Sequence, residues 1–226
     1  MTATQEKIVP LTRIQKLVGE RMLTSKRTQP CFYLTAQADV GEIYKIRRPL
    51  SKRLGVRISM NDFFIRAIAV AAEKYPLMTQ GRINVALAVA SPGGLVAPAI
   101  KDANLKTLAD VAKETMELVE KARNNKLTLD DLDRACITLT MLGMFGIDSF
   151  LAIPAPGQQS ILSAGKIIDQ PVPCGGEIKV RKIIEFGLAA DAAKVSPDYA
   201  AKFLVEITNL VSNPQKLIAV ETKKSL

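Results

Sequence analysis

The stretch from Phe186 to Leu204 constrains the fold most, because a strand pattern passes into a helix start through one short polar loop. An apolar run ends at Asp191. Ser196-Pro197-Asp198 then offers an N-cap hydroxyl, a proline at the first helical position and an acid in the first turn. Rigid elements hold such a loop while water reaches it, so it is a usual place for a functional site. We therefore look for functional residues between positions 191 and 198.

Capping signals and hydrophobic spacing predict the other elements. Thr12 with Gln15 matches a capping box, Ser59 precedes an apolar helical pattern, and Thr107 opens a long amphipathic one. The continuous apolar run 83–90 predicts a strand buried on both faces. Helices are predicted at 12–25, 40–54, 59–74, 107–124 and 197–212, strands at 30–35, 83–90, 95–100, 135–140, 160–164 and 177–188, and a turn at 171–176.

Length and composition favour one compact α/β domain. The chain has 226 residues, 48% of them hydrophobic, with no apolar run as long as a membrane span and no signal-peptide pattern at the N-terminus. We expect a soluble protein that does not enter a membrane. Its predicted parts are a disordered segment at 1–8, a core domain at 9–220 and a polar tail at 221–226.

Charge and cysteine content argue against several kinds of site. The net charge of +9 comes from basic residues mixed with acids along the predicted helices, and aromatic residues make up only 5% of the chain, so nucleic-acid binding is not expected. The three cysteines lie far apart and form neither a disulfide framework nor a metal motif. The chain contains no histidine, which excludes imidazole-based zinc or iron sites, and no metal is expected.

Several segments resemble, in order, those of the dihydrolipoamide acyltransferases. They include Ser59-Met60-Asn61-Asp62, the hairpin at 91–100, the run 135–146 and the loop after Asp191. The chain resembles the catalytic core of the acyltransferase component of 2-oxo acid dehydrogenase complexes from residue 9 to about 220. The resemblance implies a chloramphenicol-acetyltransferase-like α/β fold (α+β layered), with a central mixed sheet packed by helices. It also implies a trimer with an active channel between subunits.

The resemblance assigns the candidate site residues. The family has Asp-His-Arg, two variable residues and Asp-Gly after the strand. Here Asp191 matches the first Asp, Ala192 stands at the His, and Ser196 at the second Asp. Thr140 stands at the family's oxyanion-binding hydroxyl. The positions implied to contact the cofactor are Met141, Gly143, Phe145 and Ala193, the last standing at the family Arg. Without the resemblance, Ser196 is a helix N-cap and Thr140 a β-branched residue at a strand end.

Acyl transfer in this family needs a group that Ala192 lacks. Dihydrolipoamide and coenzyme A, the implied substrates, exchange an acyl group with no covalent enzyme intermediate. The attacking thiol has a pKa near 8.5 and needs a base poised near neutral pH, which histidine suits. Because alanine accepts no proton, we expect acyl transfer to be lost or strongly reduced. The expected function is then a trimer-based scaffold or cage.

Three alternatives remain open at this point. A working acyltransferase could use another base, for example Asp191, and the charge of +9 alone suggests a polyanion-binding module. The two adjacent alanines fit either a natural relative that kept the core for assembly or a deliberate substitution in a working enzyme.

The resemblance also implies partners and a compartment. Lipoyl domains would be supplied from elsewhere. The compartment would be the cytoplasm in a bacterium or the mitochondrial matrix in a eukaryote.

Overall fold

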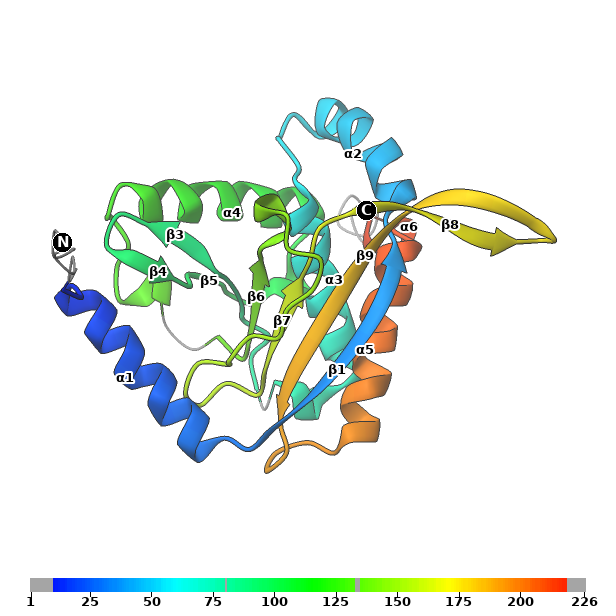
Figure 1. The fold of residues 1–226 in the computed structure, drawn as a ribbon. Helices are drawn as coiled ribbons and strands as arrows, with labels where there is room; N and C mark the ends of the chain where they lie inside the picture. The colour runs from blue at the N-terminus through cyan, green and yellow to red at the C-terminus, as the bar shows by residue number, and fades with distance from the viewer. Residues whose placement is uncertain (1–9, 80, 133–134, 219–226) are drawn as a thin grey trace, which may run out of the picture.

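The computed structural model of the chain describes residues 10–79, 81–132 and 135–218 (Figure 1). The predicted terminal segments 1–8 and 221–226 lie outside the described residues. The strands are β1 (Cys31–Asp39), β2 (Val85–Leu87), β3 (Val89–Ser91), β4 (Gly94–Val96), β5 (Ala99–Ile100), β6 (Ile137–Met141), β7 (Ser160–Ala164), β8 (Ile168–Cys174) and β9 (Glu177–Asp191).

A mixed sheet forms the centre of the molecule. Among the described residues it has seven strands. Six of them follow the order β1-β9-β7-β6-β2-β5, and the seventh, β8, pairs with residues 177–183 at the start of β9. Strand β6 is parallel to both β2 and β7, whereas β9 is antiparallel to β1, β7 and β8. The predicted central mixed sheet is confirmed.

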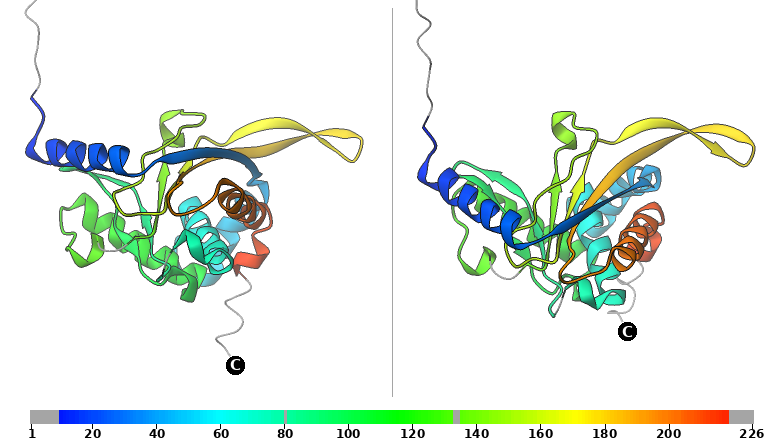
Figure 2. Two further views of the ribbon diagram at one scale, coloured as in Figure 1. Left: turned by 90° about the horizontal axis from the view of Figure 1, so that it is seen from below. Right: turned by 60° about the horizontal axis from the view of Figure 1, so that its bottom comes forward.

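Four helices pack against strands on one face (Figure 2): α2 (Gly41–Leu54), α3 (Met60–Lys74), α4 (Leu108–Arg123) and α5 (Pro197–Ser212). The short helix α6 (Gln215–Ile218) contacts α3, whereas α1 (Arg13–Thr28) projects from the body. The 3₁₀ turns are η1 (Pro76–Met78), η2 (Ala103–Leu105), η3 (Asp130–Leu132) and η4 (Gly143–Phe145). Phe64 of α3 meets Phe186 of β9 edge to face, with 5.1 Å between ring centroids. Phe203 of α5 is fully buried in the same core.

The main helices begin at the residues that the sequence predicts. Thr12 and Gln15 form the predicted capping box: Gln15 N–H donates to the Thr12 hydroxyl at 3.2 Å, and Thr12 N–H donates to Gln15 Oε1 at 2.9 Å. Ser59 and Thr107 cap α3 and α4 with the same reciprocal pattern. Each cap satisfies backbone N–H groups that have no partner inside the helix.

Three predicted elements are wrong. The predicted strand 95–100 is divided between β4 in the two-stranded sheet and β5 in the main sheet. The run 83–90 is not one strand, because β2 stays in the main sheet while β3 pairs with β4 in a separate two-stranded sheet. One register continues across the break, since Ala86 pairs with Ala99 and Val89 with Val96. Opposite the break lies Pro98, which has no N–H to donate to the ladder. The predicted turn at 171–176 is also wrong: β8 continues to Cys174, and only Gly175 and Gly176 turn.

Two elements reach away from the body on opposite sides, α1 and the β8–β9 hairpin (Figures 1 and 2). The apolar stripe of α1 is largely uncovered, and Leu17 is 51% exposed. At the hairpin Ile178 is 79% exposed. Exposed apolar patches of this kind are a feature of interaction surfaces. Within the described residues, no helix has both the length and the apolar composition needed to cross a bilayer.

Candidate functional site

The loop after β9 is built around the carboxylate of Asp191. This residue is buried, with 2% of its surface exposed. Its Oδ1 accepts a hydrogen bond from Ala193 N–H at 3.0 Å. Its Oδ2 accepts one from Gln29 Nε2 at 3.3 Å and lies 3.4 Å from the Lys194 ammonium. Both oxygens are therefore engaged by donors, and the carboxylate serves to hold the loop.

The side chains at the predicted base and arginine positions point to no polar partner. Ala192 and Ala193 are both exposed, and the Ala192 N–H donates to the Pro30 carbonyl at 2.8 Å. Ser196 is the N-cap residue of α5, with Pro197 at the first helical position, as the sequence predicts. Its hydroxyl, however, donates to Asp198 instead of accepting from a helix N–H. That hydrogen bond lowers the pKa of Asp198, and nearby Lys202 lowers it further.

Cys31 lies beside this loop, because it pairs with Asp191 across β1 and β9. Burial raises the pKa of its thiol, and the Asp191 carboxylate raises it further. A thiol with a raised pKa holds its proton more firmly, so Cys31 is a poor proton acceptor near neutral pH.

Thr140 lies near the end of β6 and is buried. The segment that follows it contains Met141 and then η4, where Met144 and Phe145 are 75% and 72% exposed. A Cβ on Gly165 would lie 1.7 Å from the Asp148 carbonyl oxygen, and one on Gly143 would lie 2.4 Å from the Gly165 oxygen. These backbone contacts fix the segment tightly, so the structure gives Gly143 a packing role that the sequence did not indicate.

One chain does not bring Thr140 and Ala192 together. Thr140 pairs with Ser163 of β7, which pairs with Gly187 of β9. From Gly187 to Asp191 the strand spans about 13 Å, and two strand spacings add about 10 Å across the sheet. The predicted site therefore consists of two separate halves in a single chain, the Thr140 half and the Ala192 half.

Some residues that shape the site gave no signal in the sequence. Gln29 reaches Asp191 from a position 162 residues earlier, and Ser25 donates to the Pro154 carbonyl across 129 residues. Lys194 contacts the Gly157 carbonyl at 3.1 Å. Contacts of this range depend on strand order and cannot be found from residue spacing.

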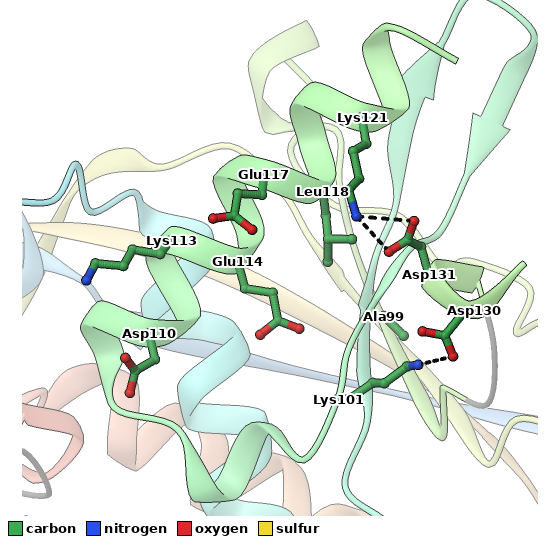
Figure 3. Close-up of a pocket in the computed structure, with 10 residues that line it drawn as sticks. All are labelled: Ala99, Lys101, Asp110, Lys113, Glu114, Glu117, Leu118, Lys121, Asp130 and Asp131. Atoms are coloured by element: carbon green, nitrogen blue, oxygen red, sulfur yellow. Dashed lines mark hydrogen bonds and ion pairs between the residues drawn. The ribbon is translucent and has the colours of Figure 1, made fainter. Parts of the chain in front are cut away.

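A cavity of about 370 Å³ lies elsewhere, between α4, the end of β5 and η3 (Figure 3). Inside it Lys101 pairs with Asp130 and Lys121 with Asp131. It shares no lining residue with either half of the site; its lining is Ala99, Lys101, Asp110, Lys113, Glu114, Glu117, Leu118, Lys121, Asp130 and Asp131. Among the described residues, no three His, Cys, Asp or Glu side chains group as metal ligands.

The sequence matches the family of the 2-oxoacid dehydrogenases acyltransferase (catalytic domain) over residues 3–219. The chain belongs to this family, which confirms the resemblance on which the predicted fold rests. It is 31% identical, over 226 aligned positions, to the dihydrolipoyllysine-residue acetyltransferase component of the pyruvate dehydrogenase complex of Rickettsia felis. That alignment covers 94% of this chain and 55% of the relative, so the chain spans about half the length of the curated relatives it matches.

Two solved structures show the same fold. The cubic core of the pyruvate dehydrogenase multienzyme complex superposes with a TM-score of 0.89 at 26% identity, covering 95% of each chain. The Azotobacter vinelandii dihydrolipoamide acetyltransferase gives 0.88 at 25% identity, covering 94% of each. The A. vinelandii structure addresses the catalytic roles of a serine, a histidine and an asparagine. In that enzyme the histidine follows the serine by 52 residues, and the asparagine follows the histidine by 4.

Proposed function

We propose that this chain is the core of a scaffold of the pyruvate dehydrogenase type that has lost, or strongly reduced, acyl transfer between dihydrolipoamide and coenzyme A. One observation carries the proposal: residue 192, where the family has its base, is alanine, and the chain contains no histidine to replace it. Removing a positioned general base costs about 10²–10⁴ in rate.

The spacing of the site residues supports this assignment. Thr140 and Ala192 are 52 residues apart, and Ala192 and Ser196 are 4 apart. These are the intervals between the serine, histidine and asparagine of the A. vinelandii enzyme. On this correspondence the chain keeps the hydroxyl that would hold an oxyanion, loses the imidazole and has a serine in place of the amide.

Asp191 is a poor alternative base, because its carboxylate is already in use. Its two oxygens receive the Ala193 N–H, the Gln29 amide and the Lys194 ammonium. Protonating the carboxylate during a reaction would weaken all three contacts, and the loop would lose its support. The geometry therefore gives no support to a working enzyme that uses Asp191.

Assembly follows from the two halves of the site. Thr140 and Ala192 can act on one substrate only if different copies supply them, so we propose a homotrimer with the channel between subunits and a larger cage built from trimers. The exposed apolar residues of α1 and the β8–β9 hairpin support such contacts. In this arrangement Met141, Gly143 and Phe145 from one copy and Ala193 from the next would border the coenzyme A and lipoamide path. Lipoyl groups would come from other domains.

The test is an acyl-transfer assay with acetyl-coenzyme A and dihydrolipoamide. We expect the parent chain to stay near the background rate and Ala192→His to raise the rate by about 10²–10⁴. Ala193→His is the matched control, since it adds the same imidazole one residue away and should restore nothing. Parent turnover that is well above background and within about tenfold of the Ala192→His variant would overturn the proposal.

A further inference from the structure

We infer that Lys194 is the positioning residue of the loop 191–196: its ammonium ties the Asp191 carboxylate to the carbonyls at 157–158 and so fixes the loop without any help from the side chains at 192 and 193. The inference deepens the proposed function and rests on it for the meaning of position 192. In the family pattern, position 194 is one of the two variable residues, and the cation stands instead at 193.

The ammonium of Lys194 has three acceptors around it. Its Nζ lies 3.1 Å from the Gly157 oxygen, 3.4 Å from the Gln158 oxygen and 3.4 Å from Asp191 Oδ2. A lysine ammonium has three donors, so this set matches its full capacity. The side chain is only 25% exposed, which places these contacts at the edge of the buried region.

Gln29 donates to two of the same acceptors. Its Nε2 donates to the Gln158 oxygen at 2.8 Å and to Asp191 Oδ2 at 3.3 Å. Its Oε1 accepts from the Ser25 hydroxyl, which also donates to the Pro154 carbonyl. Ser25, Gln29 and Lys194 thereby connect the end of α1, the segment 154–159 and the β9–α5 loop around the Asp191 carboxylate.

The charge of Lys194 is what distinguishes it from Gln29. A buried carboxylate is costly unless an opposite charge and hydrogen bonds compensate it. Within the described part of the chain, Lys194 supplies the ion pair of Asp191. Because Ala193 contributes only its backbone N–H, the loop keeps its shape with a cation one residue further on. An imidazole introduced at 192 would therefore project from a loop that is already fixed.

Amide hydrogen exchange of residues 192–196 in the assembled protein tests this inference. We expect Lys194→Met to speed exchange by about tenfold or more, and Lys194→Arg, which keeps the charge, to rescue most of the protection. Lys202→Met is the control, because Lys202 pairs with Asp198 on the open surface of α5. Should Lys194→Met fail to assemble, Lys194→Gln replaces it with the same expected direction. Unchanged exchange in the uncharged variant overturns the inference.

A second readout separates this inference from the proposed function. In the Ala192→His background, Lys194→Met should lower the acyl-transfer rate at saturating substrate, and Lys194→Arg should restore it. Hydrogen exchange needs no catalysis. If Ala192→His is inactive but Lys194→Met still speeds amide exchange, the result counts only against the proposed function. If Ala192→His is active and its rate does not change with Lys194→Met, the result counts only against the inference.

Discussion

Ala192 places a methyl group in the loop beside Asp191, and both oxygens of the Asp191 carboxylate have partners. Asp191 is held by Gln29, Lys194 and the Ala193 N–H, although the side chains at 192 and 193 add nothing to the network. The support of the loop and the chemistry of the loop are thus carried by different residues. The loop therefore keeps its shape without a polar side chain at position 192.

Gly165 directly follows β7 and packs closely against Asp148 in the segment after Thr140. Its φ is not positive, so its backbone suits any residue, but a Cβ would lie 1.7 Å from the Asp148 carbonyl oxygen. We predict that Gly165→Ala lowers the free energy of unfolding by about 1–3 kcal/mol or more, measured by urea unfolding. Gly19→Ala is the control: a Cβ there meets nothing within 4 Å, so it should stabilise α1 by about 0.5–1 kcal/mol. Equal stabilities of the two variants would contradict the packing argument.

Asp62 gives a prediction about pH. It lies buried in the first turn of α3, and its Oδ2 accepts from the Ser59 N–H at 2.6 Å and from the Ser59 hydroxyl at 2.8 Å. Burial raises the pKa of Asp62, against the lowering effect of these hydrogen bonds. The folded state then binds more protons than the unfolded state between the two pKa values. The contribution of this carboxyl to stability is therefore lost as pH rises from about 4 through the folded pKa.

Asp62→Asn keeps an oxygen acceptor for Ser59 but does not ionise. We predict that the free energy of unfolding of this variant, relative to the parent, increases as pH rises above about 4. Urea unfolding at a series of pH values measures the difference. A difference that is flat or that falls with rising pH would show that burial does not control this carboxyl.

At the scale of elements, local signals predicted the helices, and non-local ones decided the sheet. Thr12, Ser59 and Thr107 start their helices as predicted, because a cap and the N–H groups it binds lie within three residues. The break in the run 83–90 involves β6, a distant strand that pairs with β2 and whose Leu139 carbonyl accepts from the Ala88 N–H. Strand β8 was missed because it contains Pro171 and Pro173, which favour turns in a sequence but are tolerated on an edge strand.

The site followed the same division. Asp191, Ala192 and Ser196 could be placed from the sequence, because one strand, one loop and one helix cap carry them. Their separation from Thr140 could not, since it depends on β7 lying between β6 and β9. Lys194 and Gln29 gained their roles only when that strand order brought the segment 157–158 beside Asp191.

Helix α1 carries a prediction about assembly. Leu17 belongs to an apolar stripe that its own body leaves open, so a neighbouring subunit should cover it. We predict that Leu17→Asp shifts the particle to smaller species at micromolar concentration while the circular dichroism spectrum stays unchanged, because a charge in a buried contact costs several kcal/mol. Met116→Asp on α4, at similar exposure, is the control and should assemble normally. An unaltered Leu17→Asp particle would place α1 outside the interface.

At the scale of the whole molecule, a single chain is an incomplete acyltransferase site. The Thr140 half and the Ala192 half are separated by part of β9 and by β7, and the segment after Thr140 carries the exposed apolar side chains of Met144 and Phe145. The fold superposes on a chain of the cubic core of the pyruvate dehydrogenase multienzyme complex. Under the proposed function, alanine at position 192 changes no residue of these exposed surfaces, so we expect assembly and catalysis to be separable.

The mass of the particle in solution tests the central claim most directly. If the two halves of the site meet between copies, native mass spectrometry of the purified chain at micromolar concentration should give three chains of 24.6 kDa, or a multiple of that trimer. A stable particle of one chain would contradict the account, because the Thr140 half and the Ala192 half would then stay apart.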